Sequence, residues 1–553
     1  MKRKIAFVTL SVMLLTMAAG CGKKKSKDDG YDLDYYKDMT GVGDSVDIDI
    51  DNGVTDENAP SDKEFDGEYN IITGDNNVTF QPSTGGDDSP LNNPTKEELK
   101  EDQYITADTV IDFETDERPK GDSNAEYDDT PSTKELKYND WVDANIGDVR
   151  ISEEQFDIEK LQLPRLIIDT VDGKDVTTRK KYVSAYLSTE NVKPQYSMTK
   201  RQIEIRGRGN STWMYFDKKP YKIKFGSKTD LFGFGLNKKY VLLANSLDET
   251  NMRSYLAMYL AHQFDVEYAS DYQMVNVILN GDYKGMYLLC EQVSEGESRV
   301  DIKTSKSGEV DTGYLIESIN SSENDDYKTF KLPDVDGKHL GDTNRHMFII
   351  KSPGVDVTSE QQEFIKDYVS QVNTAIFKKD WAAIQKLCDV DSFVNMTLVN
   401  AIMMNNDYGY SFYMYKKKGG KLHLGPVWDF DQSSGSSTHG GTTYRGWFAG
   451  TEHDWQTSLL EIPEFRALVA KRYKEKHAVV AGLTGVMEKA INDYEFDFAM
   501  NNLERNNVFA LPDRWRIPSS IAKLDTYKKH VGALKTWFLN RQIWLDDQLG
   551  VKQ

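Results

Sequence analysis

The stretch from Asp391 to Ser434 limits the possible folds of this chain more than any other part of its sequence. Asp391 is a candidate N-cap, and the residues after it are apolar on almost every side of a helix, so this helix is expected to be buried. Two aromatic, alternating segments, 411–417 and 421–428, then flank a Gly-Gly pair, which is the pattern of a β-hairpin. The sequence therefore predicts a buried helix that leads directly into an antiparallel hairpin.

Three aspartates stand at the two ends of this hairpin. Asp407 follows the helix, and Asp429 and Asp431 follow the second strand. Because an antiparallel hairpin brings its ends together, these carboxylates are expected to meet. Like charges repel unless a cation or a shared proton offsets them, so we expect a hard ion such as Mg²⁺ there. The alternative is that Asp407 caps a turn and that the other two are solvated loop acids.

The same order of parts occurs in protein kinases. There a buried helix leads to a proton-accepting Asp, a hairpin follows, and the Asp of an Asp-Phe-Gly sequence holds Mg²⁺ on the nucleotide phosphates. By this resemblance Asp407 corresponds to the proton acceptor, and Asp429 to the metal-binding residue with Asp431 beside it.

The N-terminus has the pattern of a bacterial lipoprotein. A basic start and a short apolar run are followed by Ala18, Ala19, Gly20 and Cys21. We expect residues 1–20 to be a signal peptide and Cys21 to carry a diacylglycerol and palmitate anchor, which implies the extracytoplasmic face of a bacterial cell membrane. The alternative is an ordinary secretory signal peptide with an unmodified cysteine.

The next segment, residues 21–140, is expected to be a disordered acidic tether. Between Lys23 and Asp140 there are 33 acidic and 12 basic residues, a net charge of −21, which equals that of the whole chain. So few apolar runs cannot bury enough surface to offset the entropy of ordering. Diffuse Ca²⁺ binding is an alternative, although no EF-hand spacing is present.

Several classes of protein are poor candidates. The sequence has no HExxH, no GxSxG and no GxxxxGK[ST], which argues against common zinc peptidases, serine esterases and P-loop NTPases. The part after the tether is nearly neutral, which argues against nucleic acid as a partner. Cys290 and Cys388 can pair or stay reduced, and the sequence leaves both options open.

From about Leu163 the pattern is that of short strands, and the third runs into a glycine-rich loop, 206–213. Arg206 and Arg208 give this loop positive charge, as an anion-binding loop requires. Lys219 precedes the next strand and Lys222 lies on its polar face, so both are further candidates for phosphate binding.

An amphipathic helix, 248–264, and a hairpin with an Asn-Gly-Asp turn at 280–282 follow. This order is that of a kinase small lobe. We therefore expect an α+β, atypical protein-kinase-like two-lobe fold with a β-rich N-terminal lobe (141–310) and a helix-rich C-terminal lobe (311–553).

Several motifs together resemble the CotH kinase family, relatives of spore-coat protein H with an atypical kinase fold. The likeness spans roughly residues 163–550 and rests on IRGRGNSTW, KKPYKIKF, VLLANS with DETNMRSYLA, VILNGDYKGMYLLCEQV, GYLIE and GPVWDFD. It implies that Asp407 acts in phosphoryl transfer, that Asp429 binds Mg²⁺, and that ATP is the phosphoryl donor. Other recurring positions that the resemblance marks for nucleotide or phosphate binding are Arg206, Lys219, Arg253 and Glu291.

The chain also departs from the family pattern. Spore-coat protein H has an Asn a few residues after the loop Asp, whereas Ser411 is nearest to that place here. A hydroxyl is a weaker metal ligand, so a second metal would need Asp431 instead. The alternative role of Lys219, Arg253 and Glu291 is ordinary ion pairing.

Two functions follow as expectations. The first is Mg²⁺-dependent phosphotransfer from ATP to protein hydroxyls, with nucleotidyl transfer as a variant in the same pocket. The second is a non-catalytic cell-surface or spore-coat-type module that binds polysaccharide or protein partners. A sugar-stacking surface for that second function is expected from Trp447, Trp455, Tyr444 and His439.

Overall fold

A computed structural model describes residues 141–305, 308–320, 327–340, 346–405, 411–436, 443–448, 455–504 and 518–551. The chain divides into two units, 1–81 and 82–553, and all described residues belong to the second. The expected signal peptide, Cys21, the acidic tether and Asp407 therefore lie outside the described residues. None of the helices in the described part of the chain has the length and apolar run that a membrane crossing needs.

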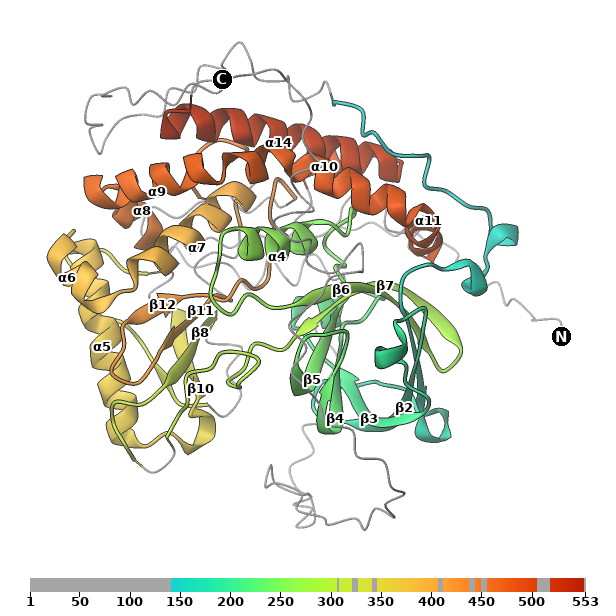
Figure 1. Ribbon diagram of the computed structural model, residues 1–553, viewed down its shortest axis with the longest axis horizontal. Helices are drawn as coiled ribbons and strands as arrows, with labels where there is room; N and C mark the ends of the chain where they lie inside the picture. The colour runs from blue at the N-terminus through green and yellow to red at the C-terminus, as the bar shows by residue number, and fades with distance from the viewer. Residues whose placement is uncertain are drawn as a thin grey trace, which may run out of the picture. The chain divides into compact units, whose positions relative to one another are not determined.

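The first half of the folded part is a closed β-barrel, shown in green and teal in Figure 1. Its strands are β1 (Arg165–Thr170), β2 (Val183–Glu190), β3 (Arg201–Gly207), β4 (Tyr221–Asp230), β5 (Leu236–Leu243), β6 (Tyr272–Leu279) and β7 (Asp282–Glu291). They are ordered β1-β2-β3-β4-β5-β7-β6 and pair antiparallel, except that β1 runs parallel to β6 and so closes the barrel. Inward-facing residues such as Leu166, Ile205 and Ile223 fill the interior and are fully buried.

The expectation of a kinase-like two-lobe fold is wrong, although the α+β class holds. The hairpin of β6 and β7 returns beside both β5 and β1, as the pairs Val241 with Cys290 and Leu166 with Val277 show. A closed barrel of seven strands therefore replaces the open sheet of a kinase small lobe. Alternation of apolar and polar residues identifies strands but does not specify which strand closes on which.

A second sheet lies in the later half of the chain. It has the order β12-β11-β8-β10-β9 and its pairs are antiparallel. Its strands are β8 (Tyr314–Asn320), β9 (Thr329–Phe330), β10 (His346–Ser352), β11 (Tyr413–Lys416) and β12 (Leu422–Leu424). The hairpin expected around the Gly-Gly pair is confirmed as β11 and β12.

Helices pack around this sheet and against the barrel. They are α3 (Ser211–Tyr215), α4 (Arg253–Gln263), α5 (Ser359–Phe377), α6 (Trp381–Leu387), α7 (Val390–Met403), α8 (Trp455–Leu460), α9 (Pro463–Glu475), α10 (His477–Asp493), α11 (Glu495–Glu504), α13 (Ser519–Ala522) and α14 (Tyr527–Leu549). Single 3₁₀ turns occur at Glu153–Gln155, Ile158–Lys160, Val171–Gly173, Pro194–Tyr196 and Gly354–Asp356. Helices α10 and α14 run side by side near the C-terminus (Figure 1).

The helix expected to be buried is α7, and it is buried from Ser392 to Met403. It contacts α4, α9 and β12, so it is enclosed on several sides. Its N-cap is Asp389, whose side chain accepts the N–H of Ser392, and not Asp391, which forms an ion pair with Arg472. Both aspartates satisfy the composition rule for N-caps, and only the turn geometry separates them.

Candidate functional site

The end of α7 and the end of the hairpin meet, as the sequence predicts. The side-chain amide of Asn405 donates to the carbonyl of Asp429 over 3.2 Å, and the N–H of Ser434 donates to the carbonyl of Met403 over 2.7 Å. The chain thus reaches Asp429 two residues before Asp407. Asp407 itself lies outside the described residues, so its distance from Asp429 stays a prediction.

Asp429 is accessible to solvent although protein surrounds it on most sides. Its backbone has a φ of +63°, a left-handed conformation that is uncommon for a residue other than glycine. Burial raises the pKa of the Asp429 carboxyl above its usual range, and the negative charge of Glu317 acts in the same direction. The positive charge of Arg208 and a hydrogen bond from the Ser411 side chain oppose this shift. We call Arg208, Lys222, Glu317, Ser411 and Asp429 the Asp429 site.

Arg208 reaches this site from the barrel. Its guanidinium lies over the ring of Trp428, 5.4 Å from the ring centroid. The loop that carries Arg208 is held by close packing, since a Cβ at Gly207 would lie 2.3 Å from the ring of Trp213. Only a glycine at position 207 leaves enough space for the ring of Trp213 to pack against the backbone.

Lys222 is the centre of a cluster of cations. It pairs with Arg206 across β4 and β3, and it also faces Arg208, Lys239 and Lys351. Burial and, to a smaller extent, these four positive charges together lower the pKa of Lys222 to about 7. Among the described residues, the Lys222 ammonium has no hydrogen-bond or ion-pair partner. A half-buried cation in this environment is suited to receive an anion from outside the protein.

Glu317 belongs to the site and Lys351 is its ion-pair partner, and neither was singled out from the sequence. Glu317 Oε1 accepts the hydroxyl of Tyr413 over 2.7 Å, and its Oε2 lies 3.1 Å from Lys351 Nζ. Glu317 is the last residue of the GYLIE motif, and that motif was the available signal. Lys351 lies on β10, the neighbour of β8, and no motif marked it.

Arg206 lies next to the site, on the outer face of the barrel. Its guanidinium donates to the carbonyl of Arg179 and lies 5.1 Å from the centroid of the Tyr182 ring. The structure therefore brings together Arg206, Arg208 and Lys222 of the predicted phosphate-binding residues.

Two other predicted residues lie in structural contacts. Lys219 donates from Nζ to the carbonyl of Trp213, in the short helix α3, over 2.6 Å. Glu291 is buried in an ion pair with Arg299 and accepts the N–H of Asp271 over 3.1 Å.

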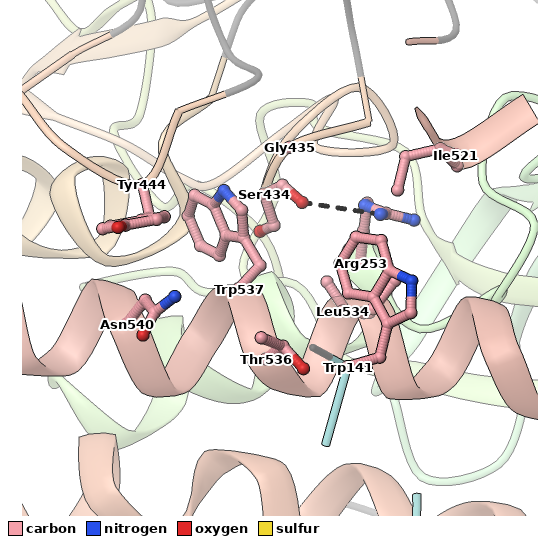
Figure 2. A pocket seen from close by; sticks show the side chains of 11 residues that line it. Trp141, Arg253, Ser434, Gly435, Tyr444, Ile521, Leu534, Thr536, Trp537 and Asn540 are labelled. Atoms are coloured by element: carbon pink, nitrogen blue, oxygen red, sulfur yellow. Dashed lines mark hydrogen bonds between the residues drawn. The ribbon is translucent and has the colours of Figure 1, made fainter. Parts of the chain in front are cut away.

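Arg253 is also buried, and its ion-pair partner is Asp248. Its Nε donates to the carbonyl of Ser433 over 2.9 Å, and a further N–H points to the carbonyl of Ser434, the interaction drawn in Figure 2. Trp537 of α14 lines the same small pocket. Arg253 therefore holds the segment that follows Asp431.

The donors at the Asp429 site suit Mg²⁺, which is commonly held by one or two carboxylates together with substrate phosphates. Asp429 supplies an accessible carboxylate, and the partly exposed Asp431 is two residues away. No cluster of three or more His, Cys, Asp or Glu that could hold a metal is found in the part of the chain that the structure describes.

The expected sugar-stacking surface is wrong for both tryptophans. Trp455 is fully buried and donates to Asn373 over 2.8 Å, while Trp447 is buried against Trp544. Buried rings cannot stack on a polysaccharide. Tyr444 is only partly exposed, and His439 lies outside the described residues. Cys290 and Cys388 are both buried and free.

A protein-family model matches the chain from residue 205 in β3 to residue 545 in α14. The matching model is described as CotH kinase protein. The chain belongs to the CotH kinase family. The matched region contains every residue of the Asp429 site. No curated protein matches the sequence.

Proposed function

We propose that this CotH kinase family member transfers a phosphoryl group from ATP to the hydroxyl of a protein acceptor at the Asp429 site, with Mg²⁺ bound by Asp429. The observation that carries the proposal is Lys222, a half-buried cation surrounded by four others, one of which, Arg208, also acts on the accessible carboxylate of Asp429. Nucleotide phosphates with a divalent cation are the ligand whose charges match this arrangement.

Each residue has a distinct proposed role. Arg208 and Lys222 bind and orient phosphate oxygens, and the side chain of Ser411 holds the Asp429 carboxylate in position. Tyr413 holds Glu317 by a hydrogen bond, and Glu317 in turn orients Lys351, whose positive charge acts on Lys222. Mg²⁺ would supply neutralisation of the negative charge on the transferred group. Asp407, by the family resemblance, would accept the proton of the acceptor hydroxyl.

The test is transfer of labelled phosphate from ATP to a protein acceptor. Asp429→Ala and Asp407→Ala are expected to lose transfer while their circular dichroism spectra match the parent. Lys366→Ala, which removes an ion pair with Glu363 on the surface of α5, is a control that should keep activity. Full transfer in both aspartate variants would reject the proposal, and mass spectrometry of the acceptor would separate phosphoryl from nucleotidyl transfer.

We also propose that the protein is anchored to the extracytoplasmic face of a bacterial membrane through Cys21. The support is the run of small residues before Cys21 after an apolar segment. Cys21→Ser is expected to move the protein from the membrane fraction to the soluble fraction. Unchanged fractionation would contradict the anchor.

The proposed extracytoplasmic location would favour a second candidate, a binding module for a protein or wall polysaccharide, because ATP is scarce outside the cell. In that case the Asp429 site binds an anionic group of the partner without transferring it. Retention of the protein on isolated cell walls that is lost in Lys222→Gln, with no labelled transfer in any variant, would favour this candidate.

A further inference from the structure

The barrel surface next to the Asp429 site carries a concentration of positive charge. The segment 179–239, which includes β2, β3 and β4, has 15 Lys and Arg residues and only 4 Asp and Glu residues. The whole of residues 141–553 has a net charge of only −3. The positive charge is therefore gathered on one part of a nearly neutral fold.

The strand register arranges these cations in a band. Lys222 pairs with Arg206, and Lys224 pairs with Glu204 on one side and Lys239 on the other. Lys222 and Lys224 share the outer face because Ile223 between them points into the barrel core. Tyr182 lies between the cations, since Arg206 and Lys224 are 5.1 Å and 5.4 Å from its ring centroid. We define the basic band as Tyr182, Arg206, Lys222, Lys224 and Lys239, with the exposed Lys180 and Lys181 at its edge.

Part of the band's positive charge has no ion-pair partner among the described residues. Glu204 pairs with Lys224 over 3.0 Å. The ammonium groups of Lys180, Lys181 and Lys222 form no ion pair with a described residue. Burial lowers the pKa of Lys222, and repulsion from the neighbouring cations acts in the same direction. An anionic partner would relieve this repulsion.

The band is also continuous with the Asp429 site, because Lys222 faces both Arg206 in the band and Arg208 beside Asp429. Neighbouring strands are about 4.8 Å apart, so the cations of β3, β4 and β5 span about 10 Å, which is the length of about three extended residues. A narrow line of this length fits one extended chain with acidic side chains at alternate positions.

We propose that the basic band binds an acidic polypeptide and that this polypeptide is the acceptor whose hydroxyl reaches the Asp429 site. The acceptor role rests on the proposed phosphotransfer, whereas the binding itself does not. Acidic residues on either side of the target Ser, Thr or Tyr would bind along the band and hold the hydroxyl near Asp429.

The test is fluorescence anisotropy with the full chain and two labelled peptides of equal length, one with a Ser among glutamates and one with a Ser among lysines. Neither ATP nor Mg²⁺ is present, so the readout does not depend on catalysis. The triple variant Lys180→Gln, Lys181→Gln, Lys224→Gln removes one ion pair and two unpaired lysines from the band.

A matched control removes the same charge elsewhere. Lys378→Gln, Lys386→Gln, Lys471→Gln also removes one ion pair, with Glu475, and two exposed lysines. We expect the acidic peptide to bind about tenfold more weakly to the band variant and unchanged to the control, since exposed charge pairs each contribute modestly. Added salt should weaken binding to the parent more than to the band variant.

Equal affinity of the band variant and the control variant would overturn the proposal, and so would equal affinity for the two peptides. Binding to phosphatidylserine vesicles without binding to the acidic peptide would also overturn it and assign the band to a membrane surface.

With the acidic peptide as acceptor, the band variant should raise the KM for the peptide and leave kcat unchanged, whereas Asp429→Ala should abolish kcat. Peptide binding without transfer in any protein would reject the proposed phosphotransfer and the acceptor role, while leaving the band as a binding surface.

Discussion

The guanidinium of Arg208, at the end of a barrel strand, lies over the ring of Trp428, the residue directly before Asp429. This contact connects the barrel to the hairpin of the second sheet at the point where an accessible carboxylate is exposed. A cation held on an aromatic face keeps its position at little entropic cost. The contact therefore places a fixed positive charge beside Asp429.

Replacing Arg208 tests this connection. Arg208→Gln is expected to lower kcat/KM for phosphoryl transfer about 10- to 100-fold, the range for losing a hydrogen bond to a charged group. The variant should also raise the pKa of Asp429 further, because Arg208 opposes the effect of burial. Steady-state kinetics of the parent, Arg208→Gln and Arg208→Lys check the prediction, and parental kinetics in Arg208→Gln would contradict it.

Lys222 is expected to reduce the stability of the folded protein while it serves anion binding. Because its pKa falls from 10.5 to about 7, the folded state binds fewer protons than the unfolded chain between these values. The cost of Lys222 is therefore largest below pH 7 and disappears as the pH rises towards 10.5.

Lys222→Met should accordingly raise the Tm more at pH 6 than at pH 9. Tripolyphosphate, as an anion that binds the site, should stabilise the parent at pH 6. Lys222→Met should lose this stabilisation. Differential scanning fluorimetry at both pH values is the measurement. A variant less stable than the parent at pH 6, or still stabilised by tripolyphosphate, would show that Lys222 has a different role.

Much of the fold could be predicted from the sequence, because the relevant interactions are local. The burial of α7 follows from apolar residues on every side of the helix, and the hairpin of β11 and β12 follows from the Gly-Gly pair between alternating strands. The closure of β1 on β6 could not be predicted, because pairing between strands more than a hundred residues apart leaves no local pattern.

The site shows the same division. Asp429, Arg206, Arg208 and Lys222 were found because motifs mark them, whereas Lys351 comes from an unmarked strand that the second sheet brings beside Lys222. The observed contacts of Arg253 include the carbonyl of Ser433, which is 180 residues later in the chain. Glu291 pairs with Arg299, which follows the end of β7. Only the folded structure brings those partners together.

Ser411 is expected to position Asp429. Its side chain donates to the Asp429 carboxylate, and its N–H donates to the carbonyl of Ser318 over 2.7 Å. Loss of a hydrogen bond that orients a metal ligand typically costs about 10- to 100-fold in metal affinity. Ser411→Ala should weaken Mg²⁺ binding by that factor in isothermal titration calorimetry, whereas Ser392→Ala, in α7, should not. Equal Mg²⁺ affinity in the two variants would exclude a positioning role.

The ion pair between Arg253 and Asp248 is expected to support the fold. Both side chains are almost fully buried, and removing one partner leaves an unpaired charge inside the protein. Arg253→Met should reduce the free energy of unfolding by about 3–5 kcal/mol in urea titration. The partly exposed control Lys366→Met should change it by less than about 0.5 kcal/mol. A loss in Arg253→Met as small as in the control would show that the pair is not needed for stability.

The central claim is that Asp429 and the cations around Lys222 bind a metal nucleotide, and isothermal titration calorimetry of ATP with Mg²⁺ tests it most directly. The account predicts saturable binding to the full chain that is abolished by EDTA and lost in both Asp429→Asn and Lys222→Gln, with Lys378→Gln unchanged. Absence of binding to the folded parent protein at millimolar ATP and Mg²⁺, or parental affinity in Asp429→Asn, would contradict the account.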